Sequence, residues 1–131
     1  MSQPRILIIE DEPLIRMFVV DSLEDSGFQV EEAENAAQAL AKLAAGNASI
    51  DAIIIDVGLP DRPGDKLAGE LRAQWTDLPI IIASGRDRHE LARQFSHDDR
   101  VVVVGKPYTA DMLLDALRDV GVSMMGSNVR N

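Results

Sequence analysis

Three carboxylates, a hydroxyl group and an ammonium group each stand near the end of an apolar run of the sequence. The residues are Glu10, Asp11, Asp56, Ser84 and Lys106. Carboxylates held close together cannot all remain charged without a counter-ion, and Mg2+, which prefers oxygen ligands, would supply one. A carboxylate beside such a cation and a lysine is well placed to attack phosphorus, because both positive charges offset the charge of the phosphoryl oxygens. The five residues therefore predict phosphoryl transfer, provided that the fold gathers them.

Each of these residues also has an ordinary structural explanation. Acids such as Asp11 are common in the first turn of a helix, where they complement its dipole. Asp56 could simply end a strand, Ser84 and the glycine after it form a usual turn pair, and Lys106-Pro107 is an uninformative dipeptide by itself. We prefer the functional interpretation because all of them would lie at one edge of the same sheet.

Five short segments have the composition of β-strands. Four are apolar without alternation, which is typical of central strands buried on both faces: Arg5–Ile9, Ala52–Asp56, 79–83 and 101–104. In the fifth, 28–33, apolar residues alternate with polar ones, as in an edge strand.

Helical patterns separate these strands. We expect helices over 13–26, from an Asn35 cap to about Ala45, over 65–75, over 89–95, and from a Thr109 cap to about Val120. Strict alternation of strands and helices predicts an α/β fold, a doubly wound, flavodoxin-like (βα)5 domain whose five parallel strands have the order 2-1-3-4-5. Sites in such sheets lie beyond the carboxyl ends of the strands, at the switch point between strands 1 and 3.

Composition limits the domain count and the chemistry. The chain has 131 residues and is 46% hydrophobic, which is enough for one core. We expect a single domain over 1–122 and a flexible C-terminal tail over 123–131. The absence of cysteine excludes thiol catalysis, zinc–thiolate sites and iron–sulfur clusters.

Charge and hydropathy limit the partners. The formal net charge is -9, from 22 acidic and 13 basic residues, so most of the surface repels nucleic-acid phosphate and we expect no direct nucleic-acid binding. The first apolar run, Ile6 to Ile9, is too short for a signal peptide or a membrane span. We therefore expect a cytoplasmic protein without a membrane partner.

Several motifs occur in a recognisable order. They are ILIIEDEPLIR with its acidic pair, AIIIDVGLP ending beyond Asp56, Ser84, and Lys106-Pro107. Pro60 lies four residues and Gly64 eight residues after Asp56. From Arg5 to Val120 the chain resembles the receiver domain of two-component response regulators, and it is similar to stand-alone and hybrid-kinase receivers.

The resemblance implies a role for each matched residue. Asp56 would be the phosphoacceptor, assisted by Ser84 and Lys106. Mg2+ would be held by Asp11, by Asp56, by Glu10 through water and by the backbone carbonyl of Gly58. The Lys106-Pro107 peptide would be cis.

The resemblance also implies a function and partners. The chain would be a phosphorylation-dependent switch that takes its phosphoryl group from a histidine kinase or a histidine phosphotransfer protein. It would act on an unknown downstream protein as a monomer or weak dimer. It would not be an enzyme in the usual sense, although it would catalyse its own phosphotransfer and dephosphorylation. Donor helices of this family usually pack near the first helix, where Leu14 and Met17 could supply contacts; we expect Phe18 to belong to the core.

Other interpretations stay open. The chain could be a receiver excised from a hybrid histidine kinase or a multidomain regulator, although its start at Met1 and its short tail favour a stand-alone protein. It could be a binding module that is never phosphorylated, against which the intact Asp56, Ser84 and Lys106 argue. A dehalogenase-like phosphatase would need Asp-x-Asp where this chain reads Glu10-Asp11-Glu12.

Four positions depart from the commoner family pattern or add to it. Glu10 replaces an aspartate, and a bridging water could absorb its extra methylene. Val103 stands where many receivers have an aromatic switch residue, and Tyr108 is a weak candidate to replace it. Arg86 could contact the phosphoryl group, although a loop arginine is more often solvated.

Overall fold

Five parallel strands alternate with five helices in the computed structural model, which describes residues 3–46, 49–85 and 87–122. The elements are β1 (Arg5–Ile9), α1 (Pro13–Asp25), β2 (Gln29–Ala33), α2 (Ala36–Ala45), β3 (Ala52–Asp56), α3 (Gly64–Gln74), β4 (Ile80–Ser84), α4 (Arg88–Gln94), β5 (Val101–Gly105) and α5 (Ala110–Asp119). Their bounds lie within two residues of the predicted ones. The predicted tail, 123–131, lies outside the described residues.

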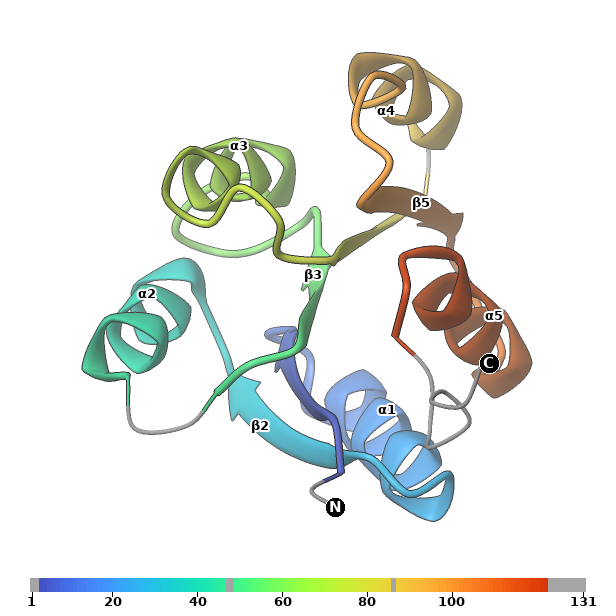
Figure 1. The fold of residues 1–131 in the computed structure, drawn as a ribbon. Coiled ribbons are helices and arrows are strands. Elements are labelled where there is room, and N and C mark those ends of the chain that lie inside the picture. The colour runs from blue at the N-terminus through green and yellow to red at the C-terminus, as the bar shows by residue number, and fades with distance from the viewer. Residues whose placement is uncertain (1–2, 47–48, 86, 123–131) are drawn as a thin grey trace.

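The sheet has the predicted order, β2-β1-β3-β4-β5, and all of its pairings are parallel. α1 and α5 cover one face, and α2, α3 and α4 cover the other (Figure 1). The predicted doubly wound, flavodoxin-like fold is therefore confirmed. None of the helices in the described part of the chain is long and apolar enough to cross a bilayer.

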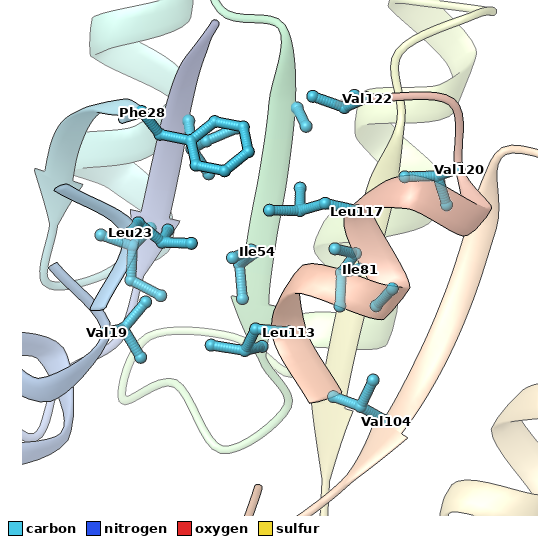
Figure 2. Packing of buried hydrophobic residues seen from close by; sticks show 14 of the residues in the cluster. Val19, Leu23, Phe28, Ile54, Ile81, Val104, Leu113, Leu117, Val120 and Val122 are labelled. Carbon is cyan, nitrogen blue, oxygen red and sulfur yellow. The ribbon is translucent and has the colours of Figure 1, made fainter. Parts of the chain in front are cut away.

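Alternate residues of the central strands supply two separate cores. Ile54 packs under α1 and α5 with Leu23 and Leu117 (Figure 2), whereas Ile53 and Ile55 face the layer of α2, α3 and α4. This is the geometry of a strand whose side chains point alternately to opposite faces. Because both faces are covered, β1, β3 and β4 are apolar along almost their whole length, as the sequence predicts.

Two expectations about burial are wrong. The run 101–104 was expected to be a central strand, but β5 lies at the edge of the sheet, and Val101 to Val103 are only half-buried. Phe18 was expected in the core, but its side chain is 42% exposed on α1. An edge strand covered by helices on its faces needs apolar residues even though one side of it has no neighbour.

The predicted helix ends are correct where a cap defines them. The Asn35 side chain accepts a hydrogen bond from the Gln38 backbone at 2.8 Å, and the Thr109 hydroxyl accepts one from the Met112 backbone at 3.1 Å. Gly46 ends α2 with a φ of 67°, a left-handed conformation that glycine adopts without steric cost. The Asn35 and Thr109 caps fix the first turns of α2 and α5, which lie at the carboxyl edge of the sheet.

Candidate functional site

The carboxyl ends of β1 and β3 bring the three predicted carboxylates together. These strands are neighbours with Ile9 opposite Ile55, so Glu10 and Asp56 both leave the sheet at the same edge. Oxygen atoms of Glu10, Asp11 and Asp56 all lie within 4.8 Å of one another. The predicted acidic cluster therefore exists, and its spacing suits shared coordination of one cation.

Lys106, the residue directly after β5, contacts this cluster. Its Nζ donates a hydrogen bond to Asp56 Oδ1 at 2.6 Å, and Asp56 is only 5% exposed. Burial lowers the pKa of Lys106, but the hydrogen bond and the negative charge of Asp56 outweigh it, so the pKa lies above its usual value. The ammonium group is thus a permanent positive charge beside the predicted phosphoacceptor.

Glu10 is the most deeply buried member of the cluster, with 2% of its surface exposed. Burial raises its pKa to about 7, and the charge of Asp56 adds to this effect, although a hydrogen bond from the Glu12 backbone at 3.0 Å opposes it. The charged form of Glu10 is therefore costly in this place without a cation. The cluster fits Mg2+, because it offers several oxygen ligands whose mutual repulsion a dication would relieve.

Ser84 ends β4 and is buried, as the predicted hydroxyl residue of the site. Ala83 lies opposite Asp56, so Ser84 is one position further towards the carboxyl edge. The Ser84 carbonyl accepts a hydrogen bond from the Lys106 backbone at 3.0 Å, which joins the two strands beside the acidic cluster. The Lys106-Pro107 peptide is cis, as the resemblance implies.

The loop after β3 runs close to Asp56. An ideal Cβ on Gly58 would lie 3.3 Å from Asp56 Oδ2, so the Gly58 backbone passes beside this carboxylate. The Gly64 backbone donates a hydrogen bond to the Val57 carbonyl at 2.8 Å, and a Cβ there would be 2.3 Å from the Asp56 carbonyl oxygen. Only glycine fits at position 64 without a shift of the backbone. The role of the Gly58 carbonyl as a metal ligand stays a prediction.

One residue of this loop has no counterpart among the predicted site residues. Asp61 Oδ1 accepts a hydrogen bond from the Ala36 backbone at 2.9 Å, and Oδ2 accepts one from the Ala37 backbone at 3.0 Å. It therefore caps α2 from 25 positions away. Its only local signal is an acidic residue in a loop, which is too common to mark a role.

The residues at positions of family variation differ in their surroundings. Val103 is half-buried against the core under α2, α3 and α4. Tyr108 is half-buried on the other face, and its ring centroid is 6.4 Å from that of Phe18. Burial and the nearby charges of Glu10 and Asp56 raise its pKa above the usual range. Arg86 lies outside the described residues.

An apolar groove lies beside the acidic cluster, between α1 and the segment after β5. Its volume is ≈ 220 Å³, and it is lined by Leu14, Ile15, Phe18, Lys106, Pro107 and Tyr108. Leu14 is 76% exposed and Met17 nearby is also exposed, which agrees with the expectation that α1 offers apolar contacts. Phe18, expected in the core, belongs to this surface.

Comparison with known proteins shows a match to one protein family. The model of the response regulator receiver domain matches residues 6–118. The KDP operon transcriptional regulatory protein KdpE of Escherichia coli is 43% identical over 81 residues, which are 62% of this chain and 35% of KdpE. The sensor kinase CckA of Brucella abortus is 29% identical over 115 residues, 88% of this chain and 12% of CckA.

A solved structure has the same fold. The response regulator TrrA of Thermotoga maritima, crystallised in complex with Mg2+ and BeF, superimposes with a TM-score of 0.74 at 28% identity, covering 90% of this chain and 99% of that one. The chain thus matches nearly the whole of this structure but only 35% of KdpE and 12% of CckA.

Proposed function

Because the chain belongs to the response regulator receiver family, we propose that Asp56 accepts a phosphoryl group from a phosphohistidine and so switches the domain between two signalling states. The observation that carries this proposal is the position of the Asp56 carboxylate. It is nearly buried, hydrogen-bonded to Lys106 at 2.6 Å, and within 4.8 Å of two further carboxylates. A structural ion pair would need only Lys106 and not the two acids beside it.

The proposed reaction forms a bond between an Asp56 oxygen and phosphorus while the bond from phosphorus to the donor histidine nitrogen breaks. The imidazole leaves with the electron pair of that bond. Lys106 lies where it offsets negative charge on the phosphoryl oxygens, and the Ser84 hydroxyl is a candidate donor to one of them. Hydrolysis of the acyl phosphate by water resets the switch, so the domain would catalyse both halves of its own cycle without being an enzyme for a separate substrate.

Mg2+ is the proposed cofactor, held by Glu10, Asp11, Asp56 and the backbone carbonyl of Gly58. The cluster supports this assignment by its oxygen donors and by the raised pKa of Glu10. When bound, Mg2+ would neutralise charge that develops on the transferred group. TrrA, a protein of similar fold, was crystallised with Mg2+ and BeF, which supports this choice of cofactor.

Phosphorylation would place on Asp56 a group that carries about -1.5 to -2 units of charge and three strong hydrogen-bond acceptors. Ser84 ends β4 and Lys106 directly follows β5, and their backbones are hydrogen-bonded to each other. A shift of Ser84 towards the phosphoryl group would therefore reach the surface of α4, β5 and α5. We propose this surface as the output that a downstream protein reads, through a shift in population between existing conformations.

The proposed partners are a histidine kinase or a phosphotransfer protein as donor and a downstream protein as target, with the domain acting in the cytoplasm as a monomer or weak dimer. The receiver domain would extend over 1–122. KdpE and CckA are far longer than this chain, so relatives place such a domain both in a transcriptional regulator and in a sensor kinase. The negative charge of this domain disfavours direct contact with nucleic acid.

Phosphotransfer from a panel of phosphorylated histidine kinases tests the proposal. We expect label to pass to the wild type in the presence of Mg2+ and not to Asp56→Asn, which keeps the shape of the side chain but loses the nucleophile. If Asp56→Asn is still labelled, another residue is the phosphoacceptor. If wild type stays unlabelled with every kinase and with a small acyl phosphate, the domain is a binding module.

A further inference from the structure

The loop between β3 and α3 is tied to α2 by the side chain of Asp61. Both carboxylate oxygens are used, at 2.9 Å from the Ala36 backbone nitrogen and at 3.0 Å from that of Ala37. The same loop carries Gly58, whose backbone passes beside Asp56 Oδ2. A single side chain therefore connects the first turn of α2 to the segment that borders the acidic cluster.

From this arrangement we infer that Asp61 is a positioning residue for the cation site: it holds the loop so that the Gly58 carbonyl can act as a ligand. The inference rests on the proposed function, because it assigns a task to Asp61 only if a cation binds at Glu10, Asp11 and Asp56. Asp61 would not be a ligand of the cation, because both of its carboxylate oxygens accept hydrogen bonds from α2. It acts through the backbone between positions 58 and 61.

The chemistry of the cap makes it a firm attachment. The first turn of α2 has no acidic residue of its own, and its local cap, Asn35, is neutral. Asp61 therefore brings a negative charge directly onto the backbone N–H groups of this helix start, where these groups and the helix dipole favour an anion. The hydrogen bond from Ala36 holds the pKa of Asp61 below its usual value, so the cap stays charged at neutral pH.

Two other contacts hold the loop between β3 and α3, and Asp61 adds a third attachment in its exposed part. Leu59 is buried in the core under α2 and α3, and the Gly64 backbone is hydrogen-bonded to Val57. Between these points, Gly58 and Asp61 are both exposed. Solvent-exposed loop backbone without side-chain ties samples several conformations, and a carbonyl ligand in such a loop binds a metal less tightly.

Asn35 offers a matched control. Its side chain caps the same helix through Gln38 but belongs to the segment before α2 rather than to the loop after β3. Asn35→Ala and Asp61→Ala both remove a cap from the first turn of α2, whereas only Asp61→Ala releases the loop. A general loosening of α2 would therefore affect both variants, and a loss of loop position would affect one.

Calorimetric titration with Mg2+ alone, without any phosphodonor, tests the inference. We expect Asp61→Ala to raise the dissociation constant for Mg2+ about 10-fold, at the lower end of the range for residues that act through a ligand. Asn35→Ala should change it less than about 2-fold, since it leaves the loop attached. Asp61→Asn keeps one acceptor oxygen and should give a smaller rise, about 3-fold.

The outcomes separate the inference from the proposed function. If the wild type binds no Mg2+, the proposed function fails. If the wild type binds Mg2+ and Asp61→Ala and Asn35→Ala bind it equally well, the positioning role of Asp61 is wrong while the proposed function stands. Should Asp61→Ala fail to fold, Asp61→Asn is compared with Asn35→Ala, and equal affinities again reject the role.

Discussion

The ion pair between Asp56 and Lys106 places a fixed positive charge beside the carboxylate that we propose as phosphoacceptor. The two groups are 2.6 Å apart, and the Lys106 pKa lies above its usual value. Both facts mean that the ammonium group stays charged throughout the neutral range. A charge that is already in place needs no rearrangement when the phosphoryl group arrives.

Lys106→Ala removes this charge and should slow phosphorylation of Asp56 by acetyl phosphate about 100-fold, as expected when one preorganised donor to a developing negative charge is lost. The rate is measured from the phosphorylated fraction over time in the presence of Mg2+. Lys66→Ala, at an exposed lysine of α3, is the control and should keep the wild-type rate. A normal rate in Lys106→Ala would leave Lys106 with a structural role only.

Most site residues could be predicted at this scale because each stands at the end of a strand. Glu10, Asp56 and Lys106 were placed by the strand pattern alone, and the structure brings them together. Asp61 could not be predicted, because a hydrogen bond to a backbone 25 positions away leaves no local pattern in the sequence. Phe18 was wrongly assigned to the core, because the sequence pattern of an apolar helix residue is the same whether its side chain packs inward or lines a surface groove.

At the scale of elements, the start of α3 depends on the absence of a side chain at Gly64. A Cβ there would lie 2.3 Å from the Asp56 carbonyl oxygen and 2.8 Å from Val57 Cα, and backbone atoms cannot move aside as a flexible side chain can. The helix therefore approaches β3 closely just after the residue that we propose as phosphoacceptor.

Gly64→Ala should lower the free energy of unfolding by about 3 kcal/mol, at the upper end of the usual cost of overpacking. Gly69→Ala, in the same helix, is the matched control: its Cβ would meet nothing within 4 Å, so the variant should be more stable than wild type by about 0.5–1 kcal/mol. Urea unfolding measures both. Opposite signs of the two changes are the essential result, and a Gly64→Ala variant as stable as wild type contradicts the close approach.

The end of α3 is joined to the loop before β5 by a second ion pair. Arg72 Nε donates to Asp98 Oδ2 at 2.7 Å, and the Arg100 backbone donates to Asp98 Oδ1 at 2.9 Å. Burial raises the pKa of Asp98, but these hydrogen bonds outweigh it, so the pKa lies below its usual value. A carboxyl group whose pKa is lowered by folding stabilises the folded protein at any pH above the pKa of that group in the unfolded chain. This contribution is lost as the pH falls through the pKa of the group in the folded protein.

Asp98→Asn should therefore destabilise the protein at pH 7 by about 1–2 kcal/mol, the cost of losing a partly buried charged hydrogen-bond partner. The difference from wild type should shrink as the pH falls from 7 to below about 4, because the unfolded chain then binds a proton at Asp98 more readily than the folded chain does. Urea unfolding of both proteins at several pH values gives the comparison. A difference that is constant over this range would mean that the charge of Asp98 contributes nothing.

The order of the elements could be predicted, whereas the exposure of β5 could not. Strands and helices alternate strictly, and right-handed crossovers leave few possible sheets. The run 101–104 is as apolar as β3 because helices cover its faces, and only its missing neighbour marks it as an edge. The pattern of apolar residues along a strand indicates which of its two faces is covered by helices. It does not indicate whether the strand has a neighbour on each side within the sheet.

At the scale of the whole molecule, the fold holds three buried or clustered acids in a domain of net charge -9. Burial of Glu10 and Asp56 without a cation costs free energy of folding, which the two hydrophobic cores on either side of the sheet must offset. A cation or an anion that binds only the folded site should therefore stabilise the domain by linkage.

Beryllofluoride with Mg2+ imitates a phosphorylated aspartate and provides this test. At about 100 times its dissociation constant, the analogue should raise the free energy of unfolding by about 2.7 kcal/mol. For a domain of this size that corresponds to a rise in Tm of about 10 °C, which a thermal melt followed by circular dichroism measures.

Two aspartate variants make this melt specific. Asp56→Asn should lose the response to beryllofluoride, because an amide oxygen does not replace the carboxylate that binds beryllium. Asp21→Asn, at an exposed position of α1, should keep the full response, which shows that the loss does not follow from a change in overall charge. Equal stabilisation of Asp56→Asn and wild type would mean that the anion binds elsewhere, and the assignment of Asp56 would then be wrong even if Mg2+ binds at the acidic cluster.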